Sequence, residues 1–304
     1  MRNAIAKLAE SLAKRGTREG AFAWAPGAAA DTESSALALL ALHGSGDQRG
    51  AQALGASAWL ESRQHADGSW PLTDAVAEPS WASAWAALAL ARHGAGAEPL
   101  ARAAGWLVAR EGVRPGLLAR ALGKLAREDE RLEQDLTLRG WPWHDAAASW
   151  VEPTATSMLA LRMLSARVVV AGARERIEEG ERLLWNRVCV NGGWNYGNRR
   201  VLGEALEPYP DTTALALAAL QGSTRRADVE RSLSALERLL DPHASSLALA
   251  LAALAFELHG RDPSGARERL AARIDRLGPP AETRTVAFGL LALGGGGELL
   301  RLPA

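Results

Sequence analysis

The chain has 304 residues, which is long for one domain but ordinary for a repeat architecture that folds as a single body. Lysine plus arginine and aspartate plus glutamate each number 35, so the formal net charge is zero and no basic surface is expected to bind nucleic acid. The single cysteine, Cys189, excludes an internal disulfide and a multi-cysteine zinc site.

Charged residues interrupt the apolar residues of positions 1–16, so this stretch lacks the apolar core of a signal peptide. No run of 18 uncharged apolar residues follows, and no transmembrane segment is predicted. We therefore expect a cytoplasmic protein, with peripheral contact to a membrane left open.

One segment type recurs along the chain: it opens with an acidic residue and continues into alanine and leucine. Because alanine and leucine cover every face with almost no charge, these segments predict helices that are buried all round and form an inner layer. The helices are expected to begin at Asp31, Glu78, Glu152, Asp211, Asp241 and Glu282, with a degenerate copy at Arg114.

Helices of a second type lie between these segments. Their apolar residues recur at helical spacing among charged residues, which predicts an outer layer. They are expected over residues 51–64, 99–111, 173–188, 227–240 and 265–277. Alternating buried and amphipathic helices indicate stacked helical hairpins, and inner helices that are apolar on every side favour a closed ring. We predict one all-α domain over residues 1–304, an α/α toroid of about six helical hairpins.

The loops before the inner helices hold most of the tryptophans. If the inner helices run in the same direction, these loops meet at one end of the ring. The functional interpretation is an aromatic pocket that binds a hydrophobic molecule. The structural interpretation is that the bulky rings cement neighbouring hairpins. The candidate substrate-binding residues are Trp81, Trp85, Trp141, Trp143, Trp150, Trp194, Tyr196 and Tyr209.

Residues Gly55–Trp70, GASAWLESRQHADGSW, resemble the QW motif of squalene-hopene cyclases, with Gln64 and Trp70 in the defining positions. Residues Asn191–Gly197 look like a looser second copy. The resemblance to this terpene cyclase and prenyltransferase repeat family extends over nearly the whole chain. It implies a toroid of the terpenoid cyclase and protein prenyltransferase type, in which the motif's glutamine caps a neighbouring helix and its tryptophan stacks beside it.

Class II terpene cyclases of this fold protonate an alkene or epoxide with the middle acid of a DxDDTA motif at the start of an inner helix. Glu152, in Trp150–Ala155, and Asp211, in Tyr209–Ala214, align with that middle acid, but the flanking acids are absent. The resemblance therefore implies an isoprenoid cyclase or isomerase that lacks the full acid cluster. The alternative is that these repeated acids only cap their helices.

Two further candidates arise in the loops. His144 and Asp145 lie beside two tryptophans, and the aspartate is in position to polarise the imidazole as an acid–base pair. Prenyltransferases of this fold hold zinc with an Asp, a Cys and a His. Here Asp241 and His243 have no nearby cysteine, so we expect no metal and no cofactor.

Two functions remain open at this point. The first is an enzyme that acts on an isoprenoid in a central hydrophobic cavity, although the chain is about half as long as a two-domain squalene cyclase. The second is a non-catalytic toroid that binds an isoprenoid, a lipid or a peptide, or that serves as an interaction scaffold. A buried Glu152 that meets other polar groups would favour chemistry, and one bonded only to its own helix amides would favour the cap. The oligomeric state is left open.

Overall fold

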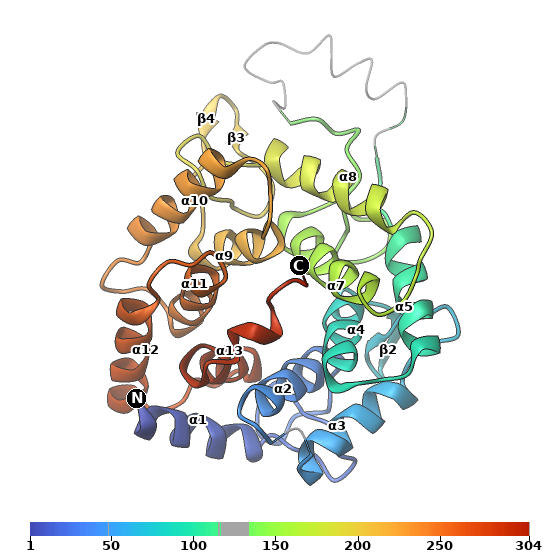
Figure 1. The fold of residues 1–304 in the computed structure, drawn as a ribbon, viewed down its shortest axis with the longest axis vertical. Coiled ribbons are helices and arrows are strands. Elements are labelled where there is room, and N and C mark those ends of the chain that lie inside the picture. The colour runs from blue at the N-terminus through green and yellow to red at the C-terminus, as the bar shows by residue number, and fades with distance from the viewer. Residues whose placement is uncertain (48, 115, 117–133, 304) are drawn as a thin grey trace.

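The computed structural model describes residues 1–304 except 48, 115, 117–133 and 304, and it places twelve α-helices within this part of the chain. The degenerate repeat predicted from Arg114 falls mainly on residues outside the described part. Half of the helices form an inner ring (Figure 1). These inner helices are α2 (Thr32–Gly44), α4 (Ala82–His93), α7 (Val151–Ser165), α9 (Pro210–Ala219), α11 (Ser246–Leu258) and α13 (Thr283–Gly294).

The other helices surround this ring and alternate with it along the chain (Figure 1). They are α1 (Arg2–Ala13), α3 (Ala51–Ser62), α5 (Ala97–Ala109), α8 (Ala173–Asn186), α10 (Arg226–Leu239) and α12 (Ser264–Leu277). Each inner helix packs on the next, and α13 packs on α2, so the ring is closed. The prediction of an all-α toroid of helical hairpins is confirmed.

Side-chain composition explains the two layers. Helix α11 buries ten of its thirteen residues, because alanine and leucine occupy nearly every position. Helix α12 instead buries Ala266, Leu270, Ala271 and Ile274, which share one face at helical spacing, while Glu268, Asp275 and Arg276 are exposed. An all-round apolar helix requires neighbours on every side, which only the inner ring provides.

Loops with two short β-hairpins connect the outer helices to the inner ones. The hairpins are β1 (Pro71–Thr73) with β2 (Val76–Pro79), and β3 (Arg200–Val201) with β4 (Glu204–Ala205). No helix of the described residues has both the length and the apolar character needed to cross a membrane.

One hydrogen-bond pattern recurs where these loops meet the inner helices. The backbone N–H of an aromatic residue donates to a buried hydroxyl in the first turns of the inner helix. The pairs are Phe22 with Ser35 (2.9 Å), Trp70 with Ser83 (2.8 Å), Trp141 with Thr154 (3.0 Å) and Trp194 with Thr213 (2.9 Å). These equivalent contacts give the repeats a common register.

The three tryptophans of this set also join the outer layer. Each indole N–H donates to a carbonyl oxygen near the end of the preceding outer helix: Trp70 to Leu60 (2.7 Å), Trp141 to Leu107 (2.8 Å) and Trp194 to Leu184 (2.6 Å). A buried indole N–H needs such a partner. Gln64 donates to the carbonyl oxygen of Pro99 in the first turn of α5 (2.9 Å) and accepts from Arg102 (2.8 Å). The glutamine thus joins the neighbouring helix through a carbonyl and a guanidinium.

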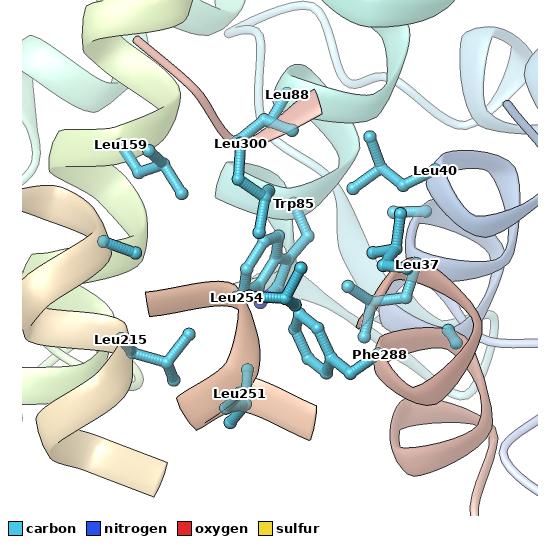
Figure 2. Close-up of a cluster of buried hydrophobic side chains, with 14 of the residues drawn as sticks. Leu37, Leu40, Trp85, Leu88, Leu159, Leu215, Leu251, Leu254, Phe288 and Leu300 are labelled. Atoms are coloured by element: carbon cyan, nitrogen blue, oxygen red, sulfur yellow. The ribbon is translucent and has the colours of Figure 1, made fainter. Parts of the chain in front are cut away.

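Apolar side chains fill the space inside the ring (Figure 2). Trp85 of α4 meets Phe288 of α13 edge to face, with ring centroids 5.6 Å apart, and both are buried. Leu300 reaches the same space from the far end, after the 3₁₀ turn η1 (Gly296–Leu299), and is buried with them. The interior predicted as a hydrophobic cavity therefore holds packed side chains.

Candidate functional site

The inner helices begin at one end of the ring, which we call the mouth. Four charged residues occupy the second position of their helices there: Glu33 in α2, Glu152 in α7, Asp211 in α9 and Arg284 in α13. Side chains at equivalent helical positions of a closed ring point toward a common centre. The mouth therefore concentrates charge above an apolar interior.

Arg284 forms ion pairs with two of these acids. Its Nη1 lies 3.1 Å from Glu33 Oε1, and its Nη2 contacts Glu152 Oε1. Helix α7 packs on α4 and α9, whereas α13 packs on α2 and α11, so the Glu152 pair spans the ring. The exposed fractions of the Arg284, Glu33 and Glu152 side chains are 21%, 18% and 10%. We call these three residues the mouth cluster.

The position of Arg284 is unfavourable on its own. A cation at a helix N-terminus meets the positive end of the helix dipole, at a cost of about 0.3–1 kcal/mol. Burial lowers the pKa of Arg284, but the carboxylates of Glu152 and Glu33 outweigh burial and raise the pKa above its usual value. The arginine is thus stabilised at this position by the two acids that it joins.

Glu33 differs from an ordinary surface carboxylate. Burial raises its pKa, Arg284 lowers it, and the neighbouring charges of Glu152 and Asp31 raise it, so that the pKa lies above its usual value. The single guanidinium of Arg284 neutralises only part of the charge of the two carboxylates that it pairs with. The mouth cluster therefore holds a carboxyl group that takes up a proton more readily than a free glutamate does.

Exposed aromatic rings lie around the mouth cluster. Tyr196 and Tyr209 pack with their ring centroids 5.0 Å apart. The charges of Asp211 and Glu152 are close enough to interact electrostatically with the Tyr196 hydroxyl. Trp150 precedes α7 directly, and its ring lies near Gly197. Tyr196, Tyr209 and Trp150 are exposed by 50%, 43% and 36%. These three predicted substrate-binding residues form one surface, which we call the aromatic rim.

The other predicted aromatic residues have structural surroundings. Trp85 is buried inside the ring, and Trp141 and Trp194 are buried beneath the loops that they join to the outer layer. Trp81 and Trp143 meet edge to face at 5.3 Å and connect the starts of α4 and α7. For these five residues the contacts match the interpretation in which bulky rings cement neighbouring hairpins.

His144 and Asp145 are both exposed, and their side chains do not meet. The imidazole Nδ1 of His144 lies 2.5 Å from the backbone carbonyl oxygen of Asp145. The Asp145 carboxylate instead accepts from Arg110 at 2.6 Å. The predicted acid–base pair is therefore not formed, because Arg110, which follows the end of α5, pairs with the aspartate.

The six repeated acids do not occupy equivalent helix starts, contrary to the sequence alignment. Asp31 is a true cap, since its side chain accepts from the Ser34 N–H at 2.7 Å. Glu152 and Asp211 lie two positions further on, and their helices are preceded by Trp150 and Tyr209 without a side-chain cap. Glu78 lies in β2, Asp241 lies in the turn before α11, and Glu282 precedes α13 without a capping bond.

Sequence reasoning missed Glu33 and Arg284. Aligning the repeats on their buried hydroxyls Ser35, Thr154 and Thr213 puts Glu33, Glu152 and Asp211 in one register, two residues before each hydroxyl. That spacing is visible in the sequence. The repeats were instead matched on Asp31, which lies two residues before Glu33, so Glu33 was not recognised as the equivalent of Glu152. The contact from Arg284 to Glu152 joins residues 132 positions apart and leaves no local signal.

Within the described part of the chain, no group of three or more His, Cys, Asp or Glu side chains is arranged to hold a metal ion. The mouth cluster combines two carboxyl groups with a guanidinium.

No protein-family model and no curated protein matches the sequence. Among solved structures, the type II terpene cyclase MstE from Scytonema superposes with a TM-score of 0.62 at 16% identity, over 98% of this chain and 99% of its own. An inactive variant of the α-1,6-mannanase GH76A of Salegentibacter sp. HEL1_6 gives 0.57 at 11% identity, over 98% and 99%. Candida albicans protein geranylgeranyltransferase-I gives 0.46 at 15% identity over 70% of this chain and 58% of its own, and supports no argument. These likenesses concern the fold, a terpene-cyclase-like α/α toroid.

Proposed function

We propose that the protein binds a hydrophobic small molecule of the isoprenoid or lipid class at the mouth of the toroid. The observation that carries this proposal is the aromatic rim: three exposed aromatic rings beside a largely buried charged cluster. Exposed apolar surface of this kind is typical of ligand sites. A terpene cyclase of the same extent, MstE, has been solved with geranylgeranyl dihydroxybenzoate bound, which supports an isoprenoid as the ligand class here.

The charges at the mouth limit which polar end groups the ligand can have. Three acidic side chains, Glu33, Glu152 and Asp211, surround the single guanidinium of Arg284, and all three carboxyl groups interact with it electrostatically. Arg200 in β3 donates to the carbonyl oxygen of Gly203 within its own hairpin at 3.0 Å. A diphosphate or carboxylate would be repelled at such a mouth. We therefore favour a neutral or cationic polar end.

Replacing both Tyr196 and Tyr209 with alanine should weaken binding of farnesol, a neutral isoprenoid probe, by about tenfold or more, because two partly exposed rings lose their apolar contact with it. Isothermal titration calorimetry measures the affinity. Val169→Ala, which trims a fully exposed side chain after the end of α7, serves as the matched control and should bind as the wild type does. Equal affinity in all three proteins, or no binding of farnesol and squalene to the wild type, would refute the proposal.

Acid-initiated cyclisation or isomerisation of that ligand is the second candidate function. It is favoured by the raised pKa of Glu33, since protonation of an alkene requires a carboxylic acid that stays neutral near pH 7. Glu152, which pairs with Arg284 across the ring, is a second candidate acid. Asp211 remains a third candidate acid. A single ring is compatible with cyclase activity, since the superposition with the terpene cyclase MstE covers 99% of the MstE chain.

If the protein is catalytic, Glu33→Gln should lower turnover about 100-fold or more while leaving farnesol affinity within about twofold, since general acid catalysis typically contributes this much. Product formation from polyprenyl alcohols and squalene is followed by gas chromatography with mass spectrometry. Glu152→Gln and Asp211→Asn show which acid acts, and Glu282→Gln, at an exposed acid without a capping bond, is the control. A wild-type protein that binds these compounds and converts none of them would leave the binding function alone.

A further inference from the structure

The segment of residues 295–303 follows α13 and crosses the middle of the ring in the view of Figure 1. It bonds to Arg92 and Gln221 at the C-terminal ends of α4 and α9, so it lies at the end opposite the mouth. Its Leu300 lies between the inner helices and is 1% exposed. Figure 2 shows this side chain pointing toward Trp85 and Phe288. Leucines from four inner helices line the same space: Leu37, Leu88, Leu159 and Leu254. One leucine thus fills the inner end of a space that is apolar on every side.

Two polar side chains of the ring hold this segment by its backbone. Arg92, at the end of α4, donates to the carbonyl oxygens of Leu299 (2.8 Å), Arg301 (2.6 Å) and Glu298 (3.2 Å). Gln221, just after α9, donates to the carbonyl oxygen of Leu300 (2.9 Å), and the Leu302 N–H donates to Gln221 Oε1 (3.2 Å). These contacts fix the path of the segment through its backbone atoms and do not involve its side chains.

The segment is connected to α13 through a glycine-rich stretch. Residues Gly294–Gly297 are four consecutive glycines, and Gly295 has a φ of +79°. No atom lies within 4 Å of the position that a Cβ would take at Gly294 or Gly295. A Cβ at Gly296 or Gly297 would instead meet Leu291 or Glu257 at 2.7 or 2.6 Å, so the open part of the run is Gly294 and Gly295, where the backbone can change direction without steric conflict. Leu300 is also the one fully buried residue among the described residues 298–303.

We infer that residues 295–303 are a displaceable plug, which occupies the interior of the ring in this structure and withdraws when the hydrophobic chain of a ligand takes the place of Leu300. The inference rests on the proposed binding function and extends it to the interior. Without the plug, the surrounding leucines and aromatic rings would face water, which is unfavourable unless another apolar group replaces Leu300. The branched methyl groups of an isoprenoid chain match the chemistry of the side chain they displace.

A plug that competes with the ligand lowers the apparent affinity, because only the open fraction of the protein binds. Gln221→Ala removes two of the plug's anchors, so we expect it to bind farnesol roughly tenfold more tightly than the wild type. Gln64→Ala is the matched control. Gln64 is a half-buried glutamine that, like Gln221, bonds to backbone carbonyl oxygens, those of Gly68 and Pro99, but it does not contact the plug. In the wild type, farnesol should also accelerate hydrogen exchange of the amides of residues 296–302.

Tighter binding by Gln221→Ala together with faster exchange in residues 296–302 supports the plug. If Gln221→Ala binds farnesol and the wild type does not, the plug is also supported. That outcome would show that the mouth by itself does not bind the ligand. Equal affinities with unchanged or slower exchange in residues 296–302 would overturn the plug and leave the proposed mouth site intact. Failure of every protein to bind farnesol would overturn both proposals. The exchange measurement uses the wild-type protein, so the test does not depend on the folding of a variant.

Discussion

Replacing Arg284 with methionine is expected to lower the free energy of unfolding at pH 7 by about 3–5 kcal/mol, toward the lower end because a fifth of the side chain is exposed. Methionine keeps much of the side-chain volume but leaves Glu33 and Glu152 facing each other without a counter-charge. Both carboxyl groups are largely buried, so the loss exceeds that of a surface ion pair. Urea denaturation, followed by circular dichroism, measures the difference.

The pH dependence of this variant has a definite sign. Without Arg284, burial and the charge of Glu152 still raise the pKa of Glu33 and the guanidinium no longer lowers it, so the folded state binds more protons than the unfolded state. The stability deficit should therefore shrink as the pH falls from 7 toward about 4–5, near the pKa of an unfolded glutamate.

Arg231→Met provides the comparison, since Arg231 pairs with Asp228 on the surface of α10 at 2.7 Å and is worth about 1 kcal/mol or less. Adding Glu33→Gln and Glu152→Gln to Arg284→Met should recover much of the loss. An Arg284→Met protein as stable as the wild type at pH 7 would show that the mouth cluster contributes nothing to stability.

Replacing Gly68 with alanine should destabilise the fold by more than about 4 kcal/mol or prevent folding, since it combines backbone strain with a clash. Gly68 has a φ of +96°, and a Cβ at this position would lie 2.2 Å from the carbonyl oxygen of Arg102 in α5. That oxygen belongs to helix backbone and cannot move aside easily. Thermal unfolding by calorimetry, or the yield of folded protein, measures the effect.

Gly94→Ala separates the two contributions to this loss. Gly94 ends α4 with a nearly equal φ of +99°, and no atom lies within 4 Å of the position of an added Cβ. Its substitution should cost only the left-handed strain, about 1–2 kcal/mol. If both variants lose the same stability, the close approach of the Gly68 loop to α5 is not what requires glycine.

The fold was predictable because its evidence is local and repeated. Alanine and leucine on all faces of one helix type, and on one face of the other, define the two layers before any contact is known. The motif around Gln64 and Trp70 indicated how the layers are joined. The indole hydrogen bonds of Trp70, Trp141 and Trp194 to helix carbonyl oxygens were not predicted and were found only in the structure.

The site was predictable only in part, because it depends on register and on distance. The acidic cap Asp31 hid Glu33, which is the residue in line with Glu152. Arg284 was invisible as a partner, since a side chain that crosses a ring contacts residues far away in the sequence. The filled interior was unforeseen for a similar reason: Leu300 stands in an unremarkable segment, and only the closed ring brings it to the centre.

The closure of the ring by α13 against α2 has a consequence for the way the protein gains its stability. An open stack of helical hairpins can fray from either end, because its outermost repeat touches a neighbour on one side only. A closed ring has no outermost repeat, and its final interface joins helices about 250 residues apart in the sequence, at a large loss of chain entropy. We therefore expect folding to be slow to complete and unfolding to be cooperative, because the first and last inner helices depend on each other as directly as any adjacent pair does.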